Sequence, residues 1–299
     1  MSRKNQKPKS QFFSSETAVA TAVAAALLLG ILIAFLTNIQ VNYVPEWKED
    51  AEYQHMSEVW EDMARLKSNI DVLAAGLQIN PDSRISMSTP IRMGGGELPV
   101  VGQMKSGGTL TINTQACGME LNITTENGPQ LQEQINCGAI SYQSHNSEYI
   151  DQTFCYENGA LILCQNARSL MKLSPQLLLE RGPSSINFSM NAISLKGSSG
   201  VLSSNAIEEI KLISEKQNPL YITEPAINVS SIAIKIYTEN PEAWATYLKT
   251  SIENANLPSE NYALLKNNSE VYFELRPSSG KKLNVNLYRA WIKIATTIQ

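Results

Sequence analysis

Residues that could carry out chemistry are few in this chain of 299 residues. It has two histidines, His55 and His145, and four cysteines, Cys117, Cys137, Cys155 and Cys164. No two cysteines have the C-x-x-C spacing of a zinc site. The nucleophile-elbow, zinc-protease, phosphate-loop and EF-hand patterns are also missing from the sequence. The cysteines are therefore better candidates for structural cross-links than for metal ligands.

The remaining polar patterns do not converge on a catalytic site. Glu208 and Glu209 alternate across a predicted strand, so their carboxylates point to opposite faces. His55 falls on the polar side of a predicted helix, and His145 falls in a predicted loop. The triple glycine at 94–96 has no following Lys-Ser/Thr and predicts a turn. We therefore expect no enzyme, no metal and no cofactor.

An even number of cysteines in an exported segment predicts two disulfides, for which three pairings exist. Cys155 and Cys164 flank a predicted hairpin around Asn158-Gly159. A two-residue turn would place Cys155 diagonal to Cys164, too far for an easy bridge, whereas a four-residue loop would place them opposite each other. We favour Cys155–Cys164 with Cys117–Cys137, and the other two pairings remain open.

Four N-x-S/T triplets are candidate glycosylation sites in an exported domain. They begin at Asn122, Asn187, Asn228 and Asn267. Such triplets are common by chance, so each is a weak signal alone. Together they are compatible with a glycoprotein.

The first element predicted by the sequence is an apolar segment long enough to span a membrane. Residues 17–45 contain no charge, and Ala18–Leu36 is an almost continuous apolar run of 19 residues. As a helix this run spans roughly the 30 Å hydrocarbon core of a bilayer. A buried core helix rarely runs so long without a charge, and the apolar region of a cleaved secretory signal is shorter, about 7–15 residues. We predict a transmembrane helix over residues 17–41.

A basic leader precedes that helix. The first nine residues of the sequence include four basic residues and no acidic one; the basic residues are Arg3, Lys4, Lys7 and Lys9. The rest of the chain has 20 of the 24 basic residues against 28 acidic ones. The positive-inside rule then puts residues 1–16 in the cytoplasm and the segment after the helix outside, in a single-pass cell-membrane protein. A pI of about 5.4 argues against nucleic acid as a partner.

The exported part is predicted to be mainly β. Residues 46–76 carry an apolar stripe at three- and four-residue steps and predict an amphipathic helix, separated from the membrane helix by a break or kink at Pro45. After Gly76 the period is near two. A further helix begins at Pro241 with Asn240 as its N-cap. We expect an antiparallel β-sandwich-like domain over residues 77–299, with a weak subdivision near 182–185.

Aromatic residues of that domain could form either a ligand groove or its core. The candidates are Trp244, Tyr272, Tyr288 and Trp291, which occupy core-like positions of the predicted strands and helix. We favour the core interpretation because large aromatic side chains dominate the interiors of such domains.

The N-terminus resembles archaeal type IV pilin and archaellin precursors with class III signal peptides. Their basic leader ends at a small residue and is often followed by Gln-x-Ser-x-Glu and the apolar helix; here Lys9-Ser10 precedes QFFSSE (11–16). A cut after Ser10 puts Gln11 first and Glu16 sixth, whereas a cut after Gln11 puts Glu16 fifth, as in the family. The resemblance implies cleavage by a prepilin-type peptidase and an assembly contact of Glu16 with a neighbouring subunit's freed amine. The alternative for Glu16 is an acid at the membrane interface, favoured by the helix dipole.

The rest of the chain resembles a broader group of archaeal pilin-like membrane proteins of no settled function. The stretches that carry this resemblance are VPEWKEDAEYQHM (44–56), DQTFCYENGALIL (151–163) and PEAWATYL (241–248). The resemblance implies a structural or minor subunit of a type IV pilus-like assembly, with the lipid bilayer and other pilin-like subunits as partners. The alternative is an uncleaved, membrane-tethered ectodomain for binding, adhesion or sensing.

Overall fold

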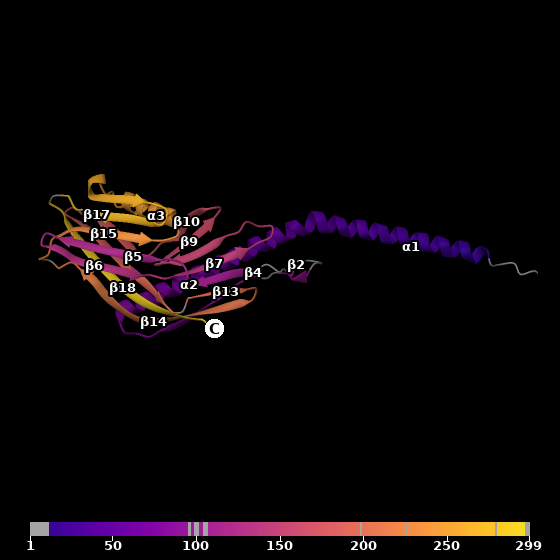
Figure 1. Ribbon diagram of the computed structural model, residues 1–299, viewed down its shortest axis with the longest axis horizontal. Helices are drawn as coiled ribbons and strands as arrows, with labels where there is room; N and C mark the ends of the chain where they lie inside the picture. Colours follow the sequence, from indigo (N-terminus) through magenta and orange to yellow (C-terminus); the bar gives the residue numbers. More distant parts are fainter. Residues whose placement is uncertain are drawn as a thin grey trace, which may run out of the picture.

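The computed structural model describes residues 12–94, 97–98, 102–103, 107–197, 199–224, 226–278 and 280–296. The chain is mainly β, as the sequence predicts, with a long helical N-terminus and one further long helix (Figure 1). The helices are α1 (Phe12–Asn38), the π-helical segment η1 (Ile39–Tyr43), α2 (Val44–Ile79), α3 (Pro241–Asn254) and the 3₁₀ turn η2 (Ser259–Asn261).

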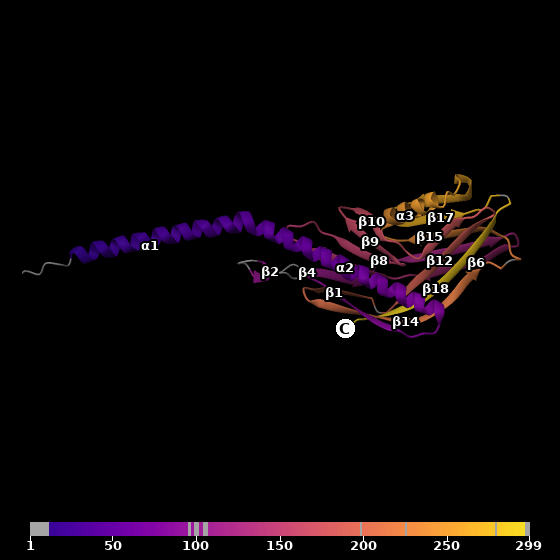
Figure 2. The same ribbon diagram turned by 180° about the vertical axis from the view of Figure 1, so that it is seen from behind.

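Helices α1 and α2 form one rod, and of the predicted break or kink at Pro45 the structure has the kink. Pro45 has no backbone N–H to continue the α-helical ladder, and the π-helical segment η1 lies directly before it. The N–H of Val44 donates to the carbonyl of Ile39, five residues back. The rod changes direction between α1 and α2 but stays helical (Figures 1 and 2).

Three large sheets make up the described β domain. The first sheet has the strand order β1 (Ser86–Arg92), β14 (Ile207–Ile222), β18 (Lys282–Thr296), β12 (Ser185–Lys196) and β11 (Leu177–Arg181). The second has the order β10 (Arg168–Leu173), β9 (Ala160–Gln165), β8 (Thr153–Glu157), β7 (Ala139–His145), β4 (Gly107–Ile112) and β13 (Gly200–Ser204). The third has the order β16 (Tyr262–Lys266), β17 (Glu270–Leu275), β15 (Val229–Tyr237), β5 (Gly118–Thr125) and β6 (Gly128–Asn136), and β2 (Glu97–Leu98) pairs with β3 (Gly102–Gln103).

The pairing is antiparallel except at the centre of the first sheet. There β12 and β18 run parallel, from Ser185 opposite Lys282 to Lys196 opposite Lys293. This pair departs from the predicted all-antiparallel arrangement. The 182–185 stretch, where a weak subdivision is predicted, connects β11 to β12 of the same sheet.

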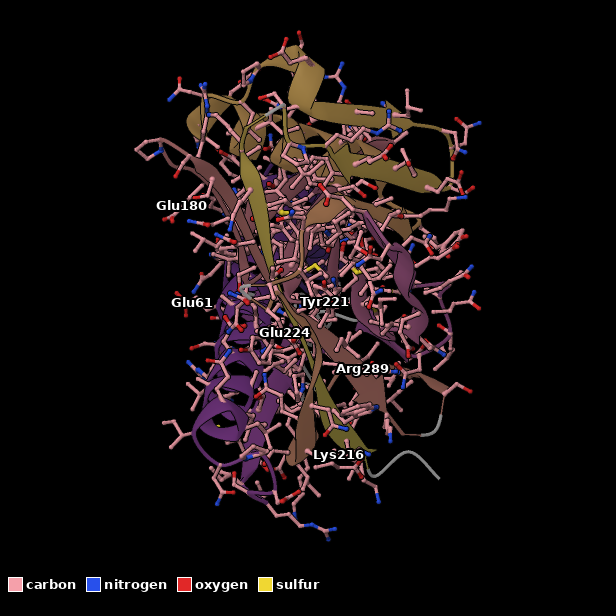
Figure 3. The ribbon with its side chains drawn as sticks, turned by 90° about the vertical axis from the view of Figure 1, so that its left-hand side faces the viewer. Glu61, Glu180, Lys216, Tyr221, Glu224 and Arg289 are labelled. Carbon is pink, nitrogen blue, oxygen red and sulfur yellow. The ribbon has the colours of Figure 1, made fainter. Side chains whose placement is uncertain are left out.

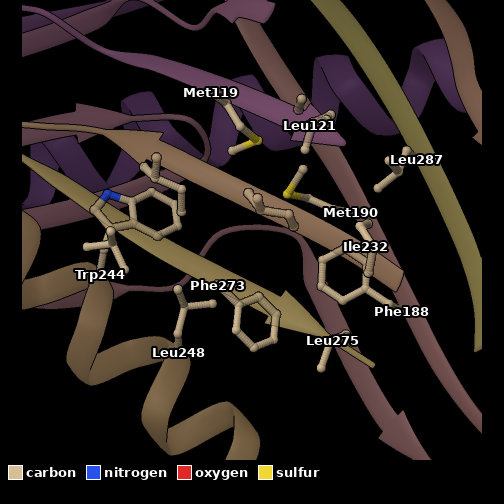
Figure 4. Packing of buried hydrophobic residues seen from close by; sticks show 14 of the residues in the cluster. Met119, Leu121, Phe188, Met190, Ile232, Trp244, Leu248, Phe273, Leu275 and Leu287 are labelled. Carbon is tan, nitrogen blue, oxygen red and sulfur yellow. The ribbon is translucent and has the colours of Figure 1, made fainter. Parts of the chain in front are cut away.

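The two parallel strands change their buried face halfway along. In their first halves, side chains such as Phe188 and Val285 pack in a core shared with the third sheet and α3, as Figure 4 shows for Phe188. In their second halves, Ile193 and Ile292 pack in another core, shared with α2 and the second sheet. Each face of the first sheet is therefore buried over only half its length.

Helix α2 lies at the centre of that second core. Its fully buried side chains recur at helical spacing, with Val59, Met63, Leu66, Ile70 and Leu73 all at 0% exposure. They pack against strands of the first and second sheets.

Helix α3 begins at Pro241, as predicted, but its cap differs. Asn240 makes no side-chain capping bond. Instead Ser169 Oγ of β10 accepts the N–H of Ala243 at 3.2 Å, and Asn240 Oδ1 accepts a hydrogen bond from the thiol of Cys164 at 2.8 Å. The helix N-terminus is thus stabilised by a neighbouring strand, a contact that local sequence does not reveal.

Candidate functional site

Helix α1 is the feature with the clearest functional chemistry. It is the single helix in the described chain that is long and apolar enough to cross a membrane, and none of its apolar window is buried in the protein. Leu27, Leu28, Ile31, Leu32 and Phe35 are each more than half exposed. An apolar helix exposed on every side suits lipid or other apolar helices, so α1 fits a single-pass membrane anchor.

The predicted leader features lie at the edge of the described chain. Ser10 and Gln11, the candidate cleavage positions, are outside the described residues. Glu16 lies within the backbone of α1, but its side chain is outside the described part. The cleavage and assembly predictions for these residues therefore remain predictions.

Aromatic side chains gather near the start of α2, where the helical rod meets the β domain. The rings of Tyr43 and Trp47 lie 6.1 Å apart, and those of Tyr53 and Tyr149 lie 5.6 Å apart in an edge-on arrangement. Tyr43 and Tyr53 are about half exposed. Tyrosine and tryptophan favour the membrane–water interface because their rings are amphipathic. These aromatic residues were not predicted to act as a group, although their spacing after the apolar run could have indicated it.

Glu52 ties the start of α2 to a loop of the second sheet. Its carboxylate accepts backbone N–H groups of Ser147, Glu148 and Tyr149 at 2.7–2.9 Å, and also the hydroxyl of Ser147 at 2.9 Å. Burial raises the pKa of Glu52, but these hydrogen bonds outweigh burial and leave the pKa below its ordinary value. Glu52 is 1% exposed in the structure.

His55 is also buried, which corrects its predicted exposure. Its Nε2 lies 3.0 Å from the hydroxyl of Tyr142, which donates to the carbonyl of Met93 at 3.1 Å. Because that hydroxyl has one proton to give, His55 donates from Nε2. Burial lowers the pKa of His55, so the neutral ring is favoured.

A buried ion pair holds the middle of α2 to β1. Asp62 is 2% exposed, and it accepts both the Nε and an Nη of Arg92 at 2.8 Å, together with the Arg92 backbone N–H at 3.0 Å. Glu58 lies 3.3 Å from the same guanidinium. The fork of the guanidinium fixes the register of α2 against the strand.

The four cysteines are free thiols in the structure, so the two predicted disulfides are not present in it. The hairpin between β8 and β9 has a two-residue turn, with Asn158 and Gly159 both at positive φ. Cys155 therefore lies opposite Ile162, and Cys164 lies opposite Thr153. The diagonal arrangement contradicts the four-residue loop on which the Cys155–Cys164 pairing depended.

The other two thiols are neighbours. The Cys137 N–H donates to the Cys117 carbonyl at 3.1 Å. A hydrogen bond with the Cys137 thiol, followed by burial, raises the pKa of Cys117 well above its ordinary value. Burial also raises the pKa of Cys164 to about 11. Protonated, buried thiols are poor nucleophiles, so these cysteines are not arranged for catalysis.

The candidate glycosylation sites divide into two groups. Asn228 and Asn267 are exposed outside the strands, where each side chain donates to a nearby glutamate. Asn122 and Asn187 are half-buried within β5 and β12. The first two positions are the more accessible to a modifying enzyme.

Two further expectations need correction. His145 is the last residue of β7, not a loop residue, and its Nε2 lies 2.8 Å from Thr109 Oγ1. Of the four aromatic residues assigned to the core, Trp244 is 1% exposed, whereas Tyr272, Tyr288 and Trp291 are only partly buried.

Trp291 lies on the half of the first sheet that is left uncovered after the change of buried face. Its ring is approached by three cations, with Lys216 Nζ at 4.6 Å, the Arg289 guanidinium at 4.7 Å and Lys196 Nζ at 5.5 Å. Lys216 and Arg289 both appear in the lower half of Figure 3. The tryptophan is therefore a cation-covered surface residue.

Glu157 is a buried carboxylate that the sequence did not single out. It accepts hydrogen bonds from Trp244 Nε1 at 2.5 Å and Thr238 Oγ1 at 2.6 Å. Burial raises its pKa. Its partners are neutral donors that join the hairpin to α3, which is a structural arrangement and not an acid–base pair.

Comparison with known proteins adds no assignment. No protein-family model, no curated protein and no solved structure matches this chain. Within the described residues, no group of three or more histidine, cysteine, aspartate or glutamate side chains could hold a metal ion.

Proposed function

We propose that this chain is a membrane-anchored, pilin-like surface protein that acts as a structural or minor component of a type IV pilus-like assembly. One observation carries the proposal. A single helical rod is exposed and apolar over α1 and then becomes the central rib of a β domain over α2. Such a rod can present an apolar helix to lipid, or to equivalent helices of other subunits, without disturbing the domain.

The leader decides between the membrane and the assembled state. Uncut, its four basic residues would each cost about 2.5–3.5 kcal/mol to move into the bilayer centre, so the chain stays anchored with its N-terminus in the cytoplasm and its β domain outside. Removal of Met1–Ser10 or Met1–Gln11 takes away these charges. The apolar helix can then leave the bilayer and pack against other copies.

The proposal includes finer features of the exported domain. The first and third sheets form a β-sandwich-like pair around a shared core, and α2 acts as an amphipathic helix over the opposite face of the first sheet. In an oxidising environment Cys117 and Cys137 form a disulfide, because a backbone hydrogen bond already holds these two residues next to each other. Asn228 and Asn267 are the favoured glycan positions.

N-terminal sequencing of the protein purified from its native membrane tests the proposal. We expect the sequence to begin at Gln11 or Phe12. In the cleaved protein, Glu16→Ala should impair assembly and leave the melting temperature of the β domain unchanged, whereas the exposed α2 control Glu46→Ala should affect neither. An intact leader on the mature protein would falsify the filament proposal.

The second candidate is an uncleaved, tethered ectodomain for binding, adhesion or sensing. A cavity of about 590 Å³ at the end of α2 farthest from the anchor favours it. This candidate needs neither peptidase processing nor helix–helix assembly, so the same sequencing experiment separates the two.

A further inference from the structure

The end of the β domain remote from the membrane carries a lined cavity. It has a volume of about 590 Å³, within the range of roughly 300–1,000 Å³ for small-ligand sites. Its walls come from the C-terminal end of α2, from β11 and β12, and from β14 and β18. The cavity occupies the uncovered face of the first halves of β12 and β18, where the sheet buries its other face against the third sheet.

Its position follows from the length of α2. The helix has 36 residues, which corresponds to about 54 Å, and the cavity is lined by Leu77 and Gln78 at its far end. This end of the molecule faces away from α1 in Figure 2 and faces the viewer in Figure 3. A ligand on another surface would meet the protein here.

The polar groups of the cavity are neutral amides and hydroxyls. The residues that line it in the described chain include no charged side chain; their polar members are Gln78, Gln176, Ser189, Asn191, Gln217, Asn286 and Tyr288. Amides both donate and accept hydrogen bonds, as do the hydroxyl groups of a sugar. The site therefore has no partner for a strongly charged ligand.

One of these amides is buried with an unused acceptor. Gln217 is 5% exposed, and its Nε2 donates to Asn191 Oδ1 at 3.3 Å, while Asn191 donates to Gln176 Oε1 at 3.2 Å. Within the described chain, Gln217 Oε1 has no hydrogen-bond partner. A buried acceptor left without a donor is costly, so a rotation of the Gln217 amide toward the cavity that let a ligand hydroxyl donate to it would gain free energy.

The remaining walls are apolar and rigid. Three prolines, Pro81, Pro175 and Pro219, line the cavity together with Leu177 and the ring of Tyr288. Prolines and an aromatic ring match the C–H faces of a pyranose and lose little conformational entropy on binding. Amides that can hydrogen-bond to hydroxyl groups lie beside these apolar walls, so the cavity favours a sugar over a purely apolar molecule.

We propose that this cavity binds a neutral oligosaccharide, with Gln217 as the central hydrogen-bonding residue and Tyr288 as an apolar contact. The binding is independent of leader cleavage and of assembly. It would let the exported domain recognise glycans on an opposing surface. Loss of this site would leave the anchor and the proposed assembly unaffected.

The test uses the full chain in a detergent without a sugar headgroup, so that the detergent does not compete. The probes are maltotriose, cellotriose, mannotriose and tri-N-acetylchitotriose, with trigalacturonate as the charged counterpart and a tetraglycine peptide as a non-sugar amide. Titrations followed by ligand-observed NMR should show saturable binding of at least one neutral trisaccharide and none of trigalacturonate. Binding of tetraglycine alone, of trigalacturonate, or of no probe would overturn the proposal.

Two variants locate the binding. Gln217→Met keeps the length of the side chain and removes its polar atoms, so affinity should fall about tenfold, the equivalent of roughly one hydrogen bond. The exposed Gln132→Met on β6 is the matched control and should bind normally. If Gln217→Met fails to fold, Ser189→Trp at the half-buried lining position fills the cavity and should abolish binding. Unchanged affinity in a folded Ser189→Trp protein would contradict the assignment.

Discussion

Helices α1 and α2 belong to one rod but are adapted to two different surroundings. Over α1 the exposed side chains are apolar on every side. Over α2 one stripe is buried, and that stripe includes four ionisable residues, Glu52, His55, Asp62 and Lys67. Lipid surrounds a membrane helix on every side, so such a helix needs apolar side chains on all of its faces. A protein core contacts only one face of a helix, so only that face must be apolar.

The buried polar residues of α2 also show what a protein partner can provide and lipid cannot. Glu52 has three backbone N–H donors, Asp62 has the Arg92 guanidinium, and Lys67 donates to Asp71 at 2.5 Å. The Glu52 and Asp62 contacts join α2 to other elements of the domain, and the Lys67 contact lies within α2 itself. On this rod, within the described residues, ionisable side chains are buried only over α2, where protein groups supply their hydrogen bonds.

The largest effect should follow from placing charge on α1. The double variant Leu28→Arg with Leu32→Arg should release the chain from the membrane fraction, because each arginine costs about 2.5–3.5 kcal/mol at the bilayer centre. The matched control is Val72→Arg on the exposed face of α2, which should remain in the membrane. Carbonate extraction and flotation measure this difference, and retention of the double variant in membranes would contradict the anchor assignment.

Truncating a core residue of α2 should have the next largest effect. Leu66 is fully buried, so Leu66→Ala should lower the free energy of unfolding of the β domain by about 2–5 kcal/mol. Leu28→Ala makes the same change on α1 and should leave the melting temperature unaltered. Chemical denaturation of both variants is the measurement. An equal loss of unfolding free energy in the two variants would contradict the distinction between α1 and α2.

Removing the Asp62 carboxylate should be less costly than the core truncation. Asp62→Ala leaves Arg92 without its bidentate partner, and since that side chain is about a third exposed we expect a loss of about 1.5–3 kcal/mol. Glu61→Ala, on the exposed neighbour, should change stability little. Thermal unfolding compares the two, and a neutral Asp62→Ala would show that the pair does not fix α2 on β1.

The smallest effect should be the pH dependence of the Glu52 contact. Because the pKa of Glu52 is lowered in the folded state, its stabilisation is present above the ordinary value of 4.5 and is lost as pH falls through the folded pKa. Glu52→Gln should cost about 1 kcal/mol at pH 7 and progressively less below pH 4.5. The exposed Glu49→Gln is the control, and a difference between wild type and Glu52→Gln that grows on acidification would have the wrong sign.

The sequence predicted the features that depend on local pattern. The apolar run predicted α1, apolar residues at three- and four-residue steps predicted α2, and Pro241 predicted the start of α3. These elements are fixed by composition and period, which a single chain displays directly.

What could not be predicted depends on contacts between distant residues. Burial of His55 depends on Tyr142, 87 residues away, and the parallel pairing of β12 with β18 places Ser185 opposite Lys282, far along the chain. The hairpin turn at Asn158-Gly159 was seen, but its length, which sets the cysteine geometry, was left open. The cavity is built by five elements, and none of its residues forms a motif in sequence.

We propose that the rod has a lipid-facing half, α1, and a protein-facing half, α2. Nitroxides attached to p-acetylphenylalanine, which needs no cysteine, can be placed along residues 19–36 and 50–77 of the full chain in lipid nanodiscs. Collision rates with oxygen and with a polar nickel complex then report each position. The account predicts that oxygen reaches every α1 position while nickel is excluded, and that both reagents vary along α2 with a period near 3.6 residues. Nickel access along one face of α1, or burial of that helix with the same period as α2, would contradict it.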